Sequence, residues 1–487
     1  MLRYDYNKGY VMNYNKFFIN GNWVEPNSKD TLPVINPANE EVICDISLGN
    51  KFDLDNAVNS ARKAFISYSK SSKEDRISIL DRIISSYKKR MDELSKAITI
   101  EMGAPKTLSE KAQVPSGLGH FMKAKKILEN FSFEKEVNSS IVLKEPVGVC
   151  GLITPWNWPL NQIACKVAPA LAAGCTMILK PSEEAPLSAI ILAEIIEESK
   201  LPEGVFNLIN GNGSELGVSM SKHPGIDMMS FTGSTRAGIS VAKNSADTVK
   251  RVTQELGGKS ANIILDDVDF TKTVAKGIFH CMNNTGQSCN APTRMLIPAD
   301  KMDEAINISK ETVLKLKVGD PQDESISVGP VVNKTQFLKI KEYISKGVEE
   351  GATLVTGGED NIKANEKGYF INPTIFANVT KDMTIFKEEI FGPVLSIISY
   401  DSEEEAIDIA NDSMYGLSGY IASNNTDKAK QFASKLRTGM VHINYAPVDQ
   451  SLPFGGYKMS GNGREWGEYG IEDFLETKAI IGIKSNS

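Results

Sequence analysis

Residues 147–180 read VGVCGLITPWNWPLNQIACKVAPALAAGCTMILK, and this stretch decides the fold class. Two continuous apolar runs, VGVCGLIT and CTMILK, flank a segment that begins at Pro159 and ends at Gly174. Proline suits the first turn of a helix and glycine suits its end. Short apolar runs that alternate with helices are typical of buried parallel strands. The stretch therefore predicts a strand–helix–strand unit of an α/β fold.

The same alternation continues along the chain. Further apolar runs occur at GVFNLI, DMMSF and RVTQEL, and the pattern resumes after Ala261 up to about Gly439. Residues 53–126 instead carry apolar residues at helical spacing. We therefore predict an α/β protein with a Rossmann-like parallel-sheet domain formed by residues 1–126 and 147–257. Residues 258–466 are predicted to form a second α/β domain.

Two further segments, 127–146 and 467–487, alternate polar and apolar residues near Phe131–Glu145 and Ile471–Ile483. They lie outside both predicted domains. We expect a small β ribbon there that pairs with another subunit, so the chain is predicted to be a homodimer or homotetramer.

The composition excludes several classes of partner. A formal charge of −7 over 487 residues gives no electrostatic reason to bind nucleic acid or an anionic membrane. The apolar runs are too short to span a bilayer. Six scattered cysteines without a C-x-x-C pair favour a reducing cytoplasm, and four scattered histidines argue against a metal site. Either Met1 or Met12 is the expected start.

Ligands of parallel sheets lie beyond the carboxyl ends of the strands. Gly233 and Ser234 stand where a strand meets a helix, and free backbone N–H groups there favour a phosphate, although Ser234 can equally cap the helix. Lys180 and Glu183 follow another strand, where a carboxylate can accept hydrogen bonds from ribose hydroxyls. The glycines of Gly211–Gly217 are spaced one residue too widely for the dinucleotide fingerprint and equally fit an ordinary turn.

Three residues carry groups suited to chemistry on a carbonyl. Cys289 ends the stretch NNTGQSC and is either a buried small hydrophobe or a nucleophile. Glu255 follows an apolar strand and is either a general base or half of an ion pair. The side-chain amide of Asn157 can stabilise an oxyanion or merely satisfy a turn.

These residues belong to motifs that resemble the aldehyde dehydrogenase superfamily. The motifs are ITPWNWP, KPSEEAPL, FTGST, QELGGKS, NTGQSC, EEIFGPV and PFGGYKMSGNGRE, in the family's order across nearly the whole chain. The resemblance implies that Cys289 forms a thiohemiacetal with an aldehyde, held by Asn157 and the Cys289 backbone N–H. Hydride transfer to NAD would leave a thioester, which water activated by Glu255 would hydrolyse to the acid.

The resemblance also implies which residues bind the cofactor, and it makes residues 1–126 with 147–257 the NAD-binding domain and 258–466 the catalytic domain. Glu183 favours NAD, with NADP possible, because a carboxylate repels a 2′-phosphate. No metal is expected. The cofactor-binding residues are Ile153, Thr154, Pro155, Trp156, Lys180, Ser182, Glu183, Gly213, Phe231, Thr232, Gly233, Ser234, Leu256, Gly257, Glu389 and Phe391.

The substrate tunnel is assigned by the same resemblance to Trp158, Asn161, Gln162 and Phe454, with Cys165 and Val448. Asn161 and Gln162 make it polar, so the alternative is an enzyme specialised for a polar aldehyde such as betaine aldehyde or a semialdehyde. The run SCNAP around the nucleophile, which begins at Ser288, departs from the run associated with betaine-aldehyde enzymes. A catalytically silent relative and a cysteine hydrolase without a redox cofactor are the other hypotheses. The intact Cys289, Glu255 and Asn157 argue against the first, and the lack of a placeable histidine argues against the second.

Overall fold

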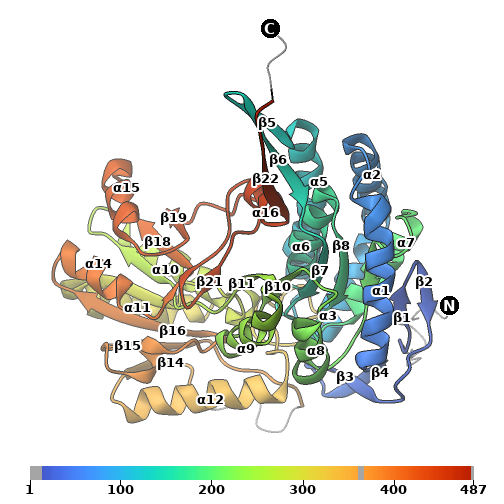
Figure 1. Ribbon diagram of the computed structural model, residues 1–487. Helices are drawn as coiled ribbons and strands as arrows, with labels where there is room; N and C mark the ends of the chain where they lie inside the picture. The colour runs from blue at the N-terminus through green and yellow to red at the C-terminus, as the bar shows by residue number, and fades with distance from the viewer. Residues whose placement is uncertain (1–13, 360–366, 484–487) are drawn as a thin grey trace.

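The computed structural model describes residues 14–359 and 367–483. Two large sheets, each flanked by helices, form most of the molecule, and a smaller sheet projects from it (Figure 1). The mixed α/β class predicted from residues 147–180 is confirmed. The two candidate starts, Met1 and Met12, and the last four residues of the predicted ribbon lie outside the described residues.

The first sheet has eight strands, and its centre is parallel. Every residue of β7, β8 and β10 is buried, which explains why these strands read as continuous apolar runs. Short antiparallel strands close both edges. The order is β2 (Asn22–Val24), β1 (Phe17–Ile19), β9 (Phe206–Leu208), β8 (Thr176–Lys180), β7 (Val149–Ile153), β10 (Met228–Thr232), β11 (Arg251–Glu255) and β21 (Gly461–Asn462).

Helix α6 (Pro159–Ala173) connects β7 to β8 and is buried along its whole length. Pro159 is its first residue and Gly174 ends it at φ 92°, a left-handed conformation that suits glycine. The predicted helices between residues 53 and 126 are present as well. The other helices packed around this sheet are α1 (Lys51–Tyr68), α2 (Lys73–Lys89), α3 (Met91–Met102), α5 (Val114–Asn130), α7 (Leu187–Glu198), α8 (Val218–Lys222) and α9 (Thr235–Ser245).

The second sheet has seven strands, parallel except at β14. Its order is β14 (Thr353–Thr356), β15 (Thr374–Ala377), β16 (Val394–Tyr400), β13 (Arg294–Pro298), β12 (Ala261–Ile264), β18 (Ser418–Ala422) and β19 (Met440–Ile443). The helices of this half include α10 (Phe270–Met282), α11 (Met302–Val313), α12 (Lys334–Glu349), α14 (Glu403–Asn411) and α15 (Thr426–Lys435).

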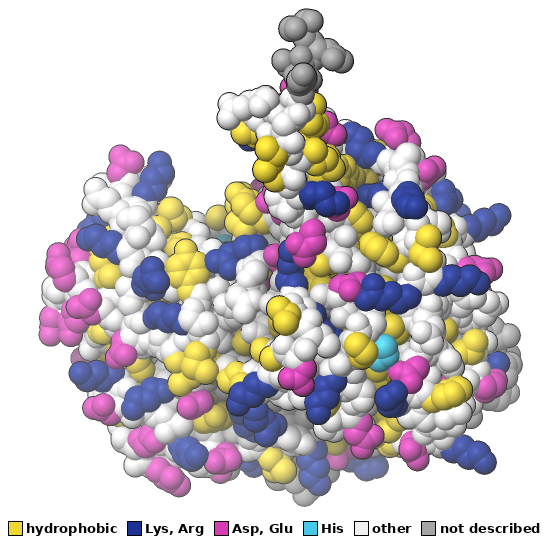
Figure 2. Space-filling model, in the orientation of Figure 1, with side chains coloured by type: hydrophobic (Ala, Val, Ile, Leu, Met, Phe, Trp, Pro, Cys, Tyr) yellow, Lys and Arg dark blue, Asp and Glu magenta, His cyan; other side chains and the backbone are white. Residues whose placement is uncertain are grey.

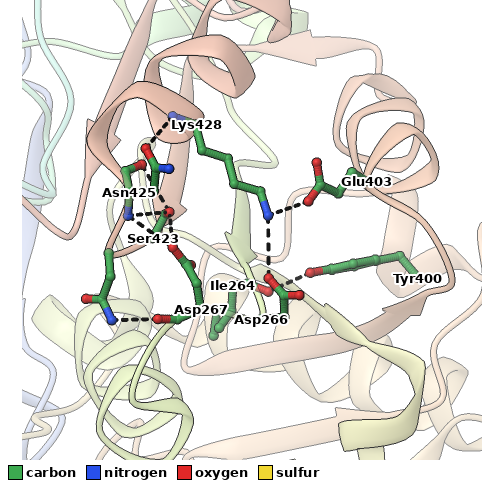
Figure 3. Close-up of polar contacts among 9 residues, drawn as sticks. Ile264, Asp266, Asp267, Tyr400, Glu403, Ser423, Asn425 and Lys428 are labelled. Atoms are coloured by element: carbon green, nitrogen blue, oxygen red, sulfur yellow. Dashed lines mark hydrogen bonds and ion pairs between the residues drawn. The ribbon is translucent and has the colours of Figure 1, made fainter.

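The carboxyl end of the second sheet is occupied by its own polar side chains. Asp267 accepts hydrogen bonds from Ser423 Oγ at 2.8 Å and from the Asn425 backbone N–H at 3.0 Å, and Lys428 bridges Asp266 and Glu403 (Figure 3). These hydrogen bonds and ion pairs tie the loops at this end of the sheet together. The opposite end of this sheet, where its parallel strands begin, faces the loops that follow the parallel strands of the first sheet.

The predicted ribbon is a three-stranded antiparallel sheet of β22 (Leu475–Ile481), β6 (Ser140–Pro146) and β5 (Glu134–Val137), which projects from the body (Figure 1). Two details differ from the predicted ranges. Residues 467–473 form helix α16, which packs on α5 and α6 through the fully buried Ile471. Strand β21, inside the range predicted for the second domain, pairs with β11 in the first sheet.

Positive and negative side chains alternate over the face seen in Figure 2, without a field of one sign. Among the described residues, no helix combines the length and the apolarity needed to cross a membrane.

Candidate active site

The site forms where the first sheet's carboxyl ends meet the second sheet's amino end. Strand β11 ends at Glu255, and residues 256–260 lead directly into β12. Cys289 lies shortly before β13, which is the neighbour of β12. This topology brings Glu255 and Cys289, which are 34 positions apart, to one place.

A cavity of about 170 Å³ lies at this junction, and Cys289, Glu255 and Asn157 all line it. The three groups that the sequence singled out for chemistry therefore converge. The other residues around the cavity are Pro155, Trp156, Gln162, Thr232, Gly233, Ser234, Leu256, Gly257, Gln336, Lys339, Glu389 and Phe391.

The loop that carries Cys289 has an unusual backbone. Asn284, Thr285 and Gly286 adopt successive left-handed conformations with φ of 52°, 58° and 71°. Such a conformation is strained for a β-branched residue such as threonine, so the surrounding structure must hold it. Two hydrogen bonds to the Asn157 carbonyl oxygen support this segment. Gln113, which directly precedes α5, donates to that oxygen from Nε2 at 3.0 Å, and Asn284 donates to it from Nδ2 at 2.9 Å.

Asn157 and Trp158 fix the other side of this loop. The Asn157 Nδ2 group donates to the Gln287 carbonyl oxygen at 3.1 Å, and the Trp158 indole N–H donates to Ser288 Oγ at 2.8 Å. These two bonds grip the residues immediately before Cys289. Because a side-chain amide carries two N–H protons, Asn157 keeps one for a ligand in the cavity.

Cys289 is half-buried, and enclosure raises the pKa of its thiol well above the ordinary range, with Glu389 and Glu255 adding to the effect. Glu255 is buried, and desolvation followed by repulsion from Glu465 raises its pKa strongly as well. Neither Glu255 oxygen has a hydrogen-bond partner among the described residues. In the ligand-free protein the Cys289 thiol is therefore neutral near pH 7, and Glu255 holds a proton more readily than an exposed carboxylate does.

A buried ion pair stands behind Glu255. Lys166 on α6 pairs with Glu465, and Lys166 also donates to Ser230 Oγ at 3.0 Å. Their side chains are only 1% and 9% exposed. After burial, which is the largest cause of the raised pKa of Glu255, Glu465 raises this pKa further and Lys166 lowers it. No pattern in the sequence predicts this pairing, although Glu465 lies inside the quoted motif PFGGYKMSGNGRE.

Glu389 and Phe391 form the opposite wall. The Gly258 backbone N–H donates to Glu389 Oε1 at 2.8 Å, and the rings of Trp156 and Phe391 meet edge to face with centroids 5.4 Å apart. Gln336 on α12 secures this segment by donating from Nε2 to the Phe391 carbonyl oxygen at 3.0 Å. Gln336 and its neighbour Lys339 line the cavity but were not predicted, because α12 carries no motif.

The remaining predicted cofactor residues lie at the strand ends beside the cavity. Lys180, the last residue of β8, pairs with Glu183 at 3.0 Å, and the Gly213 backbone N–H donates to Glu183 Oε1 at 3.3 Å. Ser234 caps α9 by accepting from the Ala237 N–H. The residues that do not line the cavity itself are Ile153, Thr154, Lys180, Ser182, Glu183, Gly213 and Phe231.

Of the predicted substrate residues, Gln162 lines the cavity, whereas Trp158, Asn161, Cys165, Val448 and Phe454 do not. Phe454 and Cys165 share an apolar cluster with Trp466, against which Cys289 packs. The ring centroids of Phe454 and Trp466 are 4.5 Å apart.

Asn161 Oδ1 accepts a 2.8 Å hydrogen bond from Nε2 of His120, a histidine that the sequence did not single out. Burial lowers the pKa of His120 to about 4, so this side chain is neutral. Val448 is 52% exposed, and neither it nor any histidine lines the cavity.

The arrangement fits a dinucleotide. Buried hydroxyls of Thr154 and Thr232 have no hydrogen-bond partner among the described residues. The amino end of α9 at Ser234 favours a phosphate, and Glu183 is positioned by Lys180 to accept from hydroxyl groups. These groups lie at the ends of the neighbouring strands β8, β7 and β10. A dinucleotide, which joins phosphates, a ribose and a ring, would need polar groups of these kinds beside Cys289.

Comparison with known proteins gives one consistent result. Residues 23–480 match the Aldehyde dehydrogenase family. The chain is 52% identical to a 3-succinoylsemialdehyde-pyridine dehydrogenase of a Pseudomonas species, over 98% of this chain and 100% of that one.

Two solved structures show the same fold. A mutant of aldehyde dehydrogenase C from Pseudomonas syringae, complexed with NAD+ and octanal, is similar with a TM-score of 0.97 and 46% identity, covering 100% of this chain and 99% of that one. A betaine aldehyde dehydrogenase from Staphylococcus aureus in complex with NAD+ has a TM-score of 0.93 and 37% identity, with 97% of each chain covered.

Proposed function

Because this chain belongs to the aldehyde dehydrogenase family, we propose that its cavity oxidises an aldehyde to the carboxylic acid with reduction of NAD. The observation that carries this proposal is the convergence of Cys289, Glu255 and Asn157 on one cavity beside Glu389 and Phe391. The chain is thus an NAD-dependent aldehyde dehydrogenase, and a silent relative would have no reason to keep all three groups together.

Cys289 begins the reaction as the nucleophile. The thiol proton passes to solvent as the sulfur bonds to the carbonyl carbon of the aldehyde, which turns the carbonyl oxygen into an oxyanion. The free N–H proton of Asn157 and the Cys289 backbone N–H stabilise that oxygen. The hydrogen bonds of Asn157 to Gln287 and of Trp158 to Ser288 hold the Cys289 sulfur and the Asn157 amide in a fixed relative position.

When bound, NAD accepts the hydride that leaves the substrate carbon as the carbonyl re-forms. The product of this step is a thioester on Cys289. Glu255 then takes a proton from water as the water oxygen attacks the thioester carbon. The carbon–sulfur bond breaks, Cys289 leaves as a thiolate, and the carboxylic acid is released.

The residues that would hold NAD follow the strand ends. Lys180 and Glu183 take the adenosine ribose, with Ser182 and Gly213 beside them, and Gly233 and Ser234 meet the pyrophosphate. Glu389 and Phe391 take the nicotinamide half. The residues that complete the binding surface are Ile153, Thr154, Pro155, Trp156, Phe231, Thr232, Leu256 and Gly257. The Glu183 carboxylate supports NAD over NADP.

A semialdehyde or another polar aldehyde is the substrate class that we favour. The 3-succinoylsemialdehyde-pyridine dehydrogenase is 52% identical to this chain, and Gln162 adds a polar group to the cavity of Cys289, which packs against the apolar cluster of Phe454 and Cys165. Neither Lys166 nor Glu465 offers an unpaired charge there, because they pair with each other.

A cytoplasmic homodimer or homotetramer is the expected state of the enzyme. None of the six cysteines, all within the described residues, forms a disulfide. The projecting sheet exposes Val137, Ile480 and Ile481, and apolar side chains gather on this projection in Figure 2. Exposed apolar strands at a sheet edge favour pairing with another copy.

One assay tests the function. NADH absorbance is followed with a panel of simple and polar aldehydes for the wild type, for Cys289→Ala and for the matched control Cys44→Ala, whose thiol is buried in β4 (Glu41–Ser47) and does not line the cavity. We expect NADH with the wild type and the control only. NADH formation by Cys289→Ala at the wild-type rate would refute the mechanism.

A further inference from the structure

A hydrogen bond between Glu184 and Asn333 joins the two halves of the protein beside the proposed cofactor site. Asn333 Nδ2 donates to Glu184 Oε1 at 2.8 Å, and the two residues are 149 positions apart. Glu184 lies in the loop between β8 and α7. Asn333 directly precedes α12, whose Ile340 and Ile344 are buried in the core of the half that contains the second sheet.

Asn333 uses both ends of its side-chain amide. Its Oδ1 atom accepts from the Gln336 backbone N–H at 2.8 Å and so caps α12, a role for which asparagine is well suited. Its Nδ2 group is thereby directed to Glu184, and a carboxylate at the amino end of a helix is favourable. Burial raises the pKa of Glu184, and the hydrogen bond from Asn333 opposes that effect. The start of α12 is thus attached to the loop after β8.

This loop carries the residues proposed for the adenosine ribose. Glu183, next to Glu184, bonds in another direction, to Lys180 at 3.0 Å and to the Gly213 backbone N–H at 3.3 Å. The Glu184 backbone N–H donates to Ser182 Oγ at 3.2 Å. The position of Glu184 is therefore coupled to that of the proposed ribose site.

The segment around Asn333 reaches the other end of the site. Gln336 Nε2 donates to the carbonyl oxygen of Phe391, the residue proposed for the nicotinamide half, at 3.0 Å. The Val332 backbone N–H donates to Gln287 Oε1 at 3.0 Å. The Gln287 carbonyl oxygen in turn accepts from Asn157. Residues 332–336 therefore contact both the nicotinamide wall and the loop that carries Cys289.

We propose that Glu184 and Asn333 are positioning residues that set the separation between the adenosine end and the nicotinamide end of the cofactor site. This inference rests on the proposed function. A dinucleotide bridges the two ends, so its affinity depends on how well their separation is fixed before it binds. A ligand of the adenosine end alone, such as AMP, meets only the residues that follow β8 and its neighbours, and does not need the bond.

Asn333→Asp tests this role without removing the helix cap. Aspartate caps a helix as well as asparagine does, but here it would place a second carboxylate against Glu184. By isothermal titration the affinity for NAD should fall about tenfold, as for the loss of one hydrogen bond to a charged group, and that for AMP by less than about twofold. KM for NAD should rise while kcat at saturating NAD is kept, because bound NAD restores the separation.

A second change reverses the bond. Glu184→Gln, added to Asn333→Asp, supplies an N–H donor to the new carboxylate and should recover most of the affinity for NAD. Asn425→Asp is the matched control, because this N-cap of α15 bonds to the Asp427 and Lys428 backbone N–H groups of its own helix. If Asn333→Asp does not fold, Asn333→Ser decides, since serine caps α12 but is too short to reach Glu184.

Two results would overturn the proposal. Wild-type affinity for NAD in Asn333→Asp would show that the bond does not affect the site, and an equal loss for AMP would show that it only shapes the ribose loop. Absence of recovery in the double variant would also count against it. If the wild type itself fails to bind NAD, the proposed function is refuted as well, so the two failures are distinguishable.

Discussion

The side-chain amide of Asn157 is bonded to the carbonyl oxygen of Gln287, 3.1 Å away and two residues before Cys289. This bond ties the residue that would hold the oxyanion to the loop that carries the nucleophile. The backbone of the same asparagine accepts from Gln113 and Asn284, so side chain and main chain are both fixed. The site is therefore pre-organised before any ligand binds.

Asn157→Asp should lower kcat/KM for aldehydes by about 10²–10³, because a carboxylate cannot donate a hydrogen bond to the oxyanion and would repel it. Steady-state kinetics with saturating NAD measures this change. NAD affinity, followed by fluorescence quenching, should remain within a few-fold of the wild type. A full-rate Asn157→Asp enzyme would show that the amide is needed neither to hold the oxyanion nor to anchor the Cys289 loop through Gln287.

The fold and the reacting groups followed from short-range patterns. The apolar runs of β7 and β8, with Pro159 and Gly174 between them, identify buried strands around a helix. Glu255 and Asn157 stood out because they follow apolar strands, whose carboxyl ends face a common site. Cys289 follows a helical pattern instead, and only the resemblance of its motif to the family marked it as a nucleophile.

Contacts between distant segments were not predictable. Lys166 and Glu465 are 299 positions apart, and a charged residue inside a helical pattern usually reads as a solvated face. Gln336 reaches the cavity only because α12 packs beside the Phe391 segment. The edge strand β21 is two residues long, too short for any periodicity to appear.

Glu255→Gln should stop the reaction at the thioester. We expect a burst of one NADH per site followed by steady turnover lowered about 10²–10⁴-fold, because the amide cannot take a proton from water. Rapid-mixing absorbance and mass spectrometry of the acylated enzyme measure both parts. In the wild type, hydrolysis of the thioester should speed up as pH rises, since the raised pKa of Glu255 keeps it protonated at lower pH. Steady turnover without a burst in Glu255→Gln would assign water activation elsewhere.

Glu183→Gln should shift cofactor preference toward NADP. The change removes the charge that would repel a 2′-phosphate and releases Lys180, its 3.0 Å partner, to bind that phosphate. We expect the ratio of kcat/KM for NADP to that for NAD to rise by about tenfold or more, a change of roughly 1.4 kcal/mol. Glu184→Gln is the matched control, because Glu184 bonds instead to Asn333 Nδ2 at 2.8 Å. An equal shift in both variants would remove Glu183 from this role.

His120 should make the protein sensitive to acid. Its folded-state pKa is lowered to about 4 by burial, whereas an unfolded histidine titrates near 6.5, about the ordinary value. The unfolded state therefore binds more protons below pH 6.5. The stability that the neutral His120 contributes is complete above that pH and is lost as pH falls toward 4. Between pH 7 and pH 5 the free energy of unfolding should fall by about 2 kcal/mol from this cause.

Urea unfolding at both pH values measures this effect. His120→Gln should reduce the change in the free energy of unfolding between the two pH values by that amount. His223→Gln should reduce it less, because His223 keeps Asp55 as a partner at 3.0 Å in the folded protein. An unchanged slope in His120→Gln would mean that this histidine is charged in the folded protein.

Lys166 and Glu465 should behave as a coupled pair in stability and in catalysis. Lys166→Met leaves the buried Glu465 carboxylate unpaired, and Glu465→Leu leaves the Lys166 ammonium unpaired. Each variant should therefore have a free energy of unfolding about 3–5 kcal/mol lower than the wild type. The double variant should recover most of that loss, because no buried charge is left without a partner.

The catalytic readout separates a role at the base from a purely structural one. Lys166 lowers and Glu465 raises the pKa of Glu255. The pH at which thioester hydrolysis reaches half its maximum should therefore move up in Lys166→Met and down in Glu465→Gln. Single-turnover hydrolysis across pH measures both shifts. If the two variants lose stability but keep the wild-type pH profile, the ion pair supports the fold and has no part in setting the charge of Glu255.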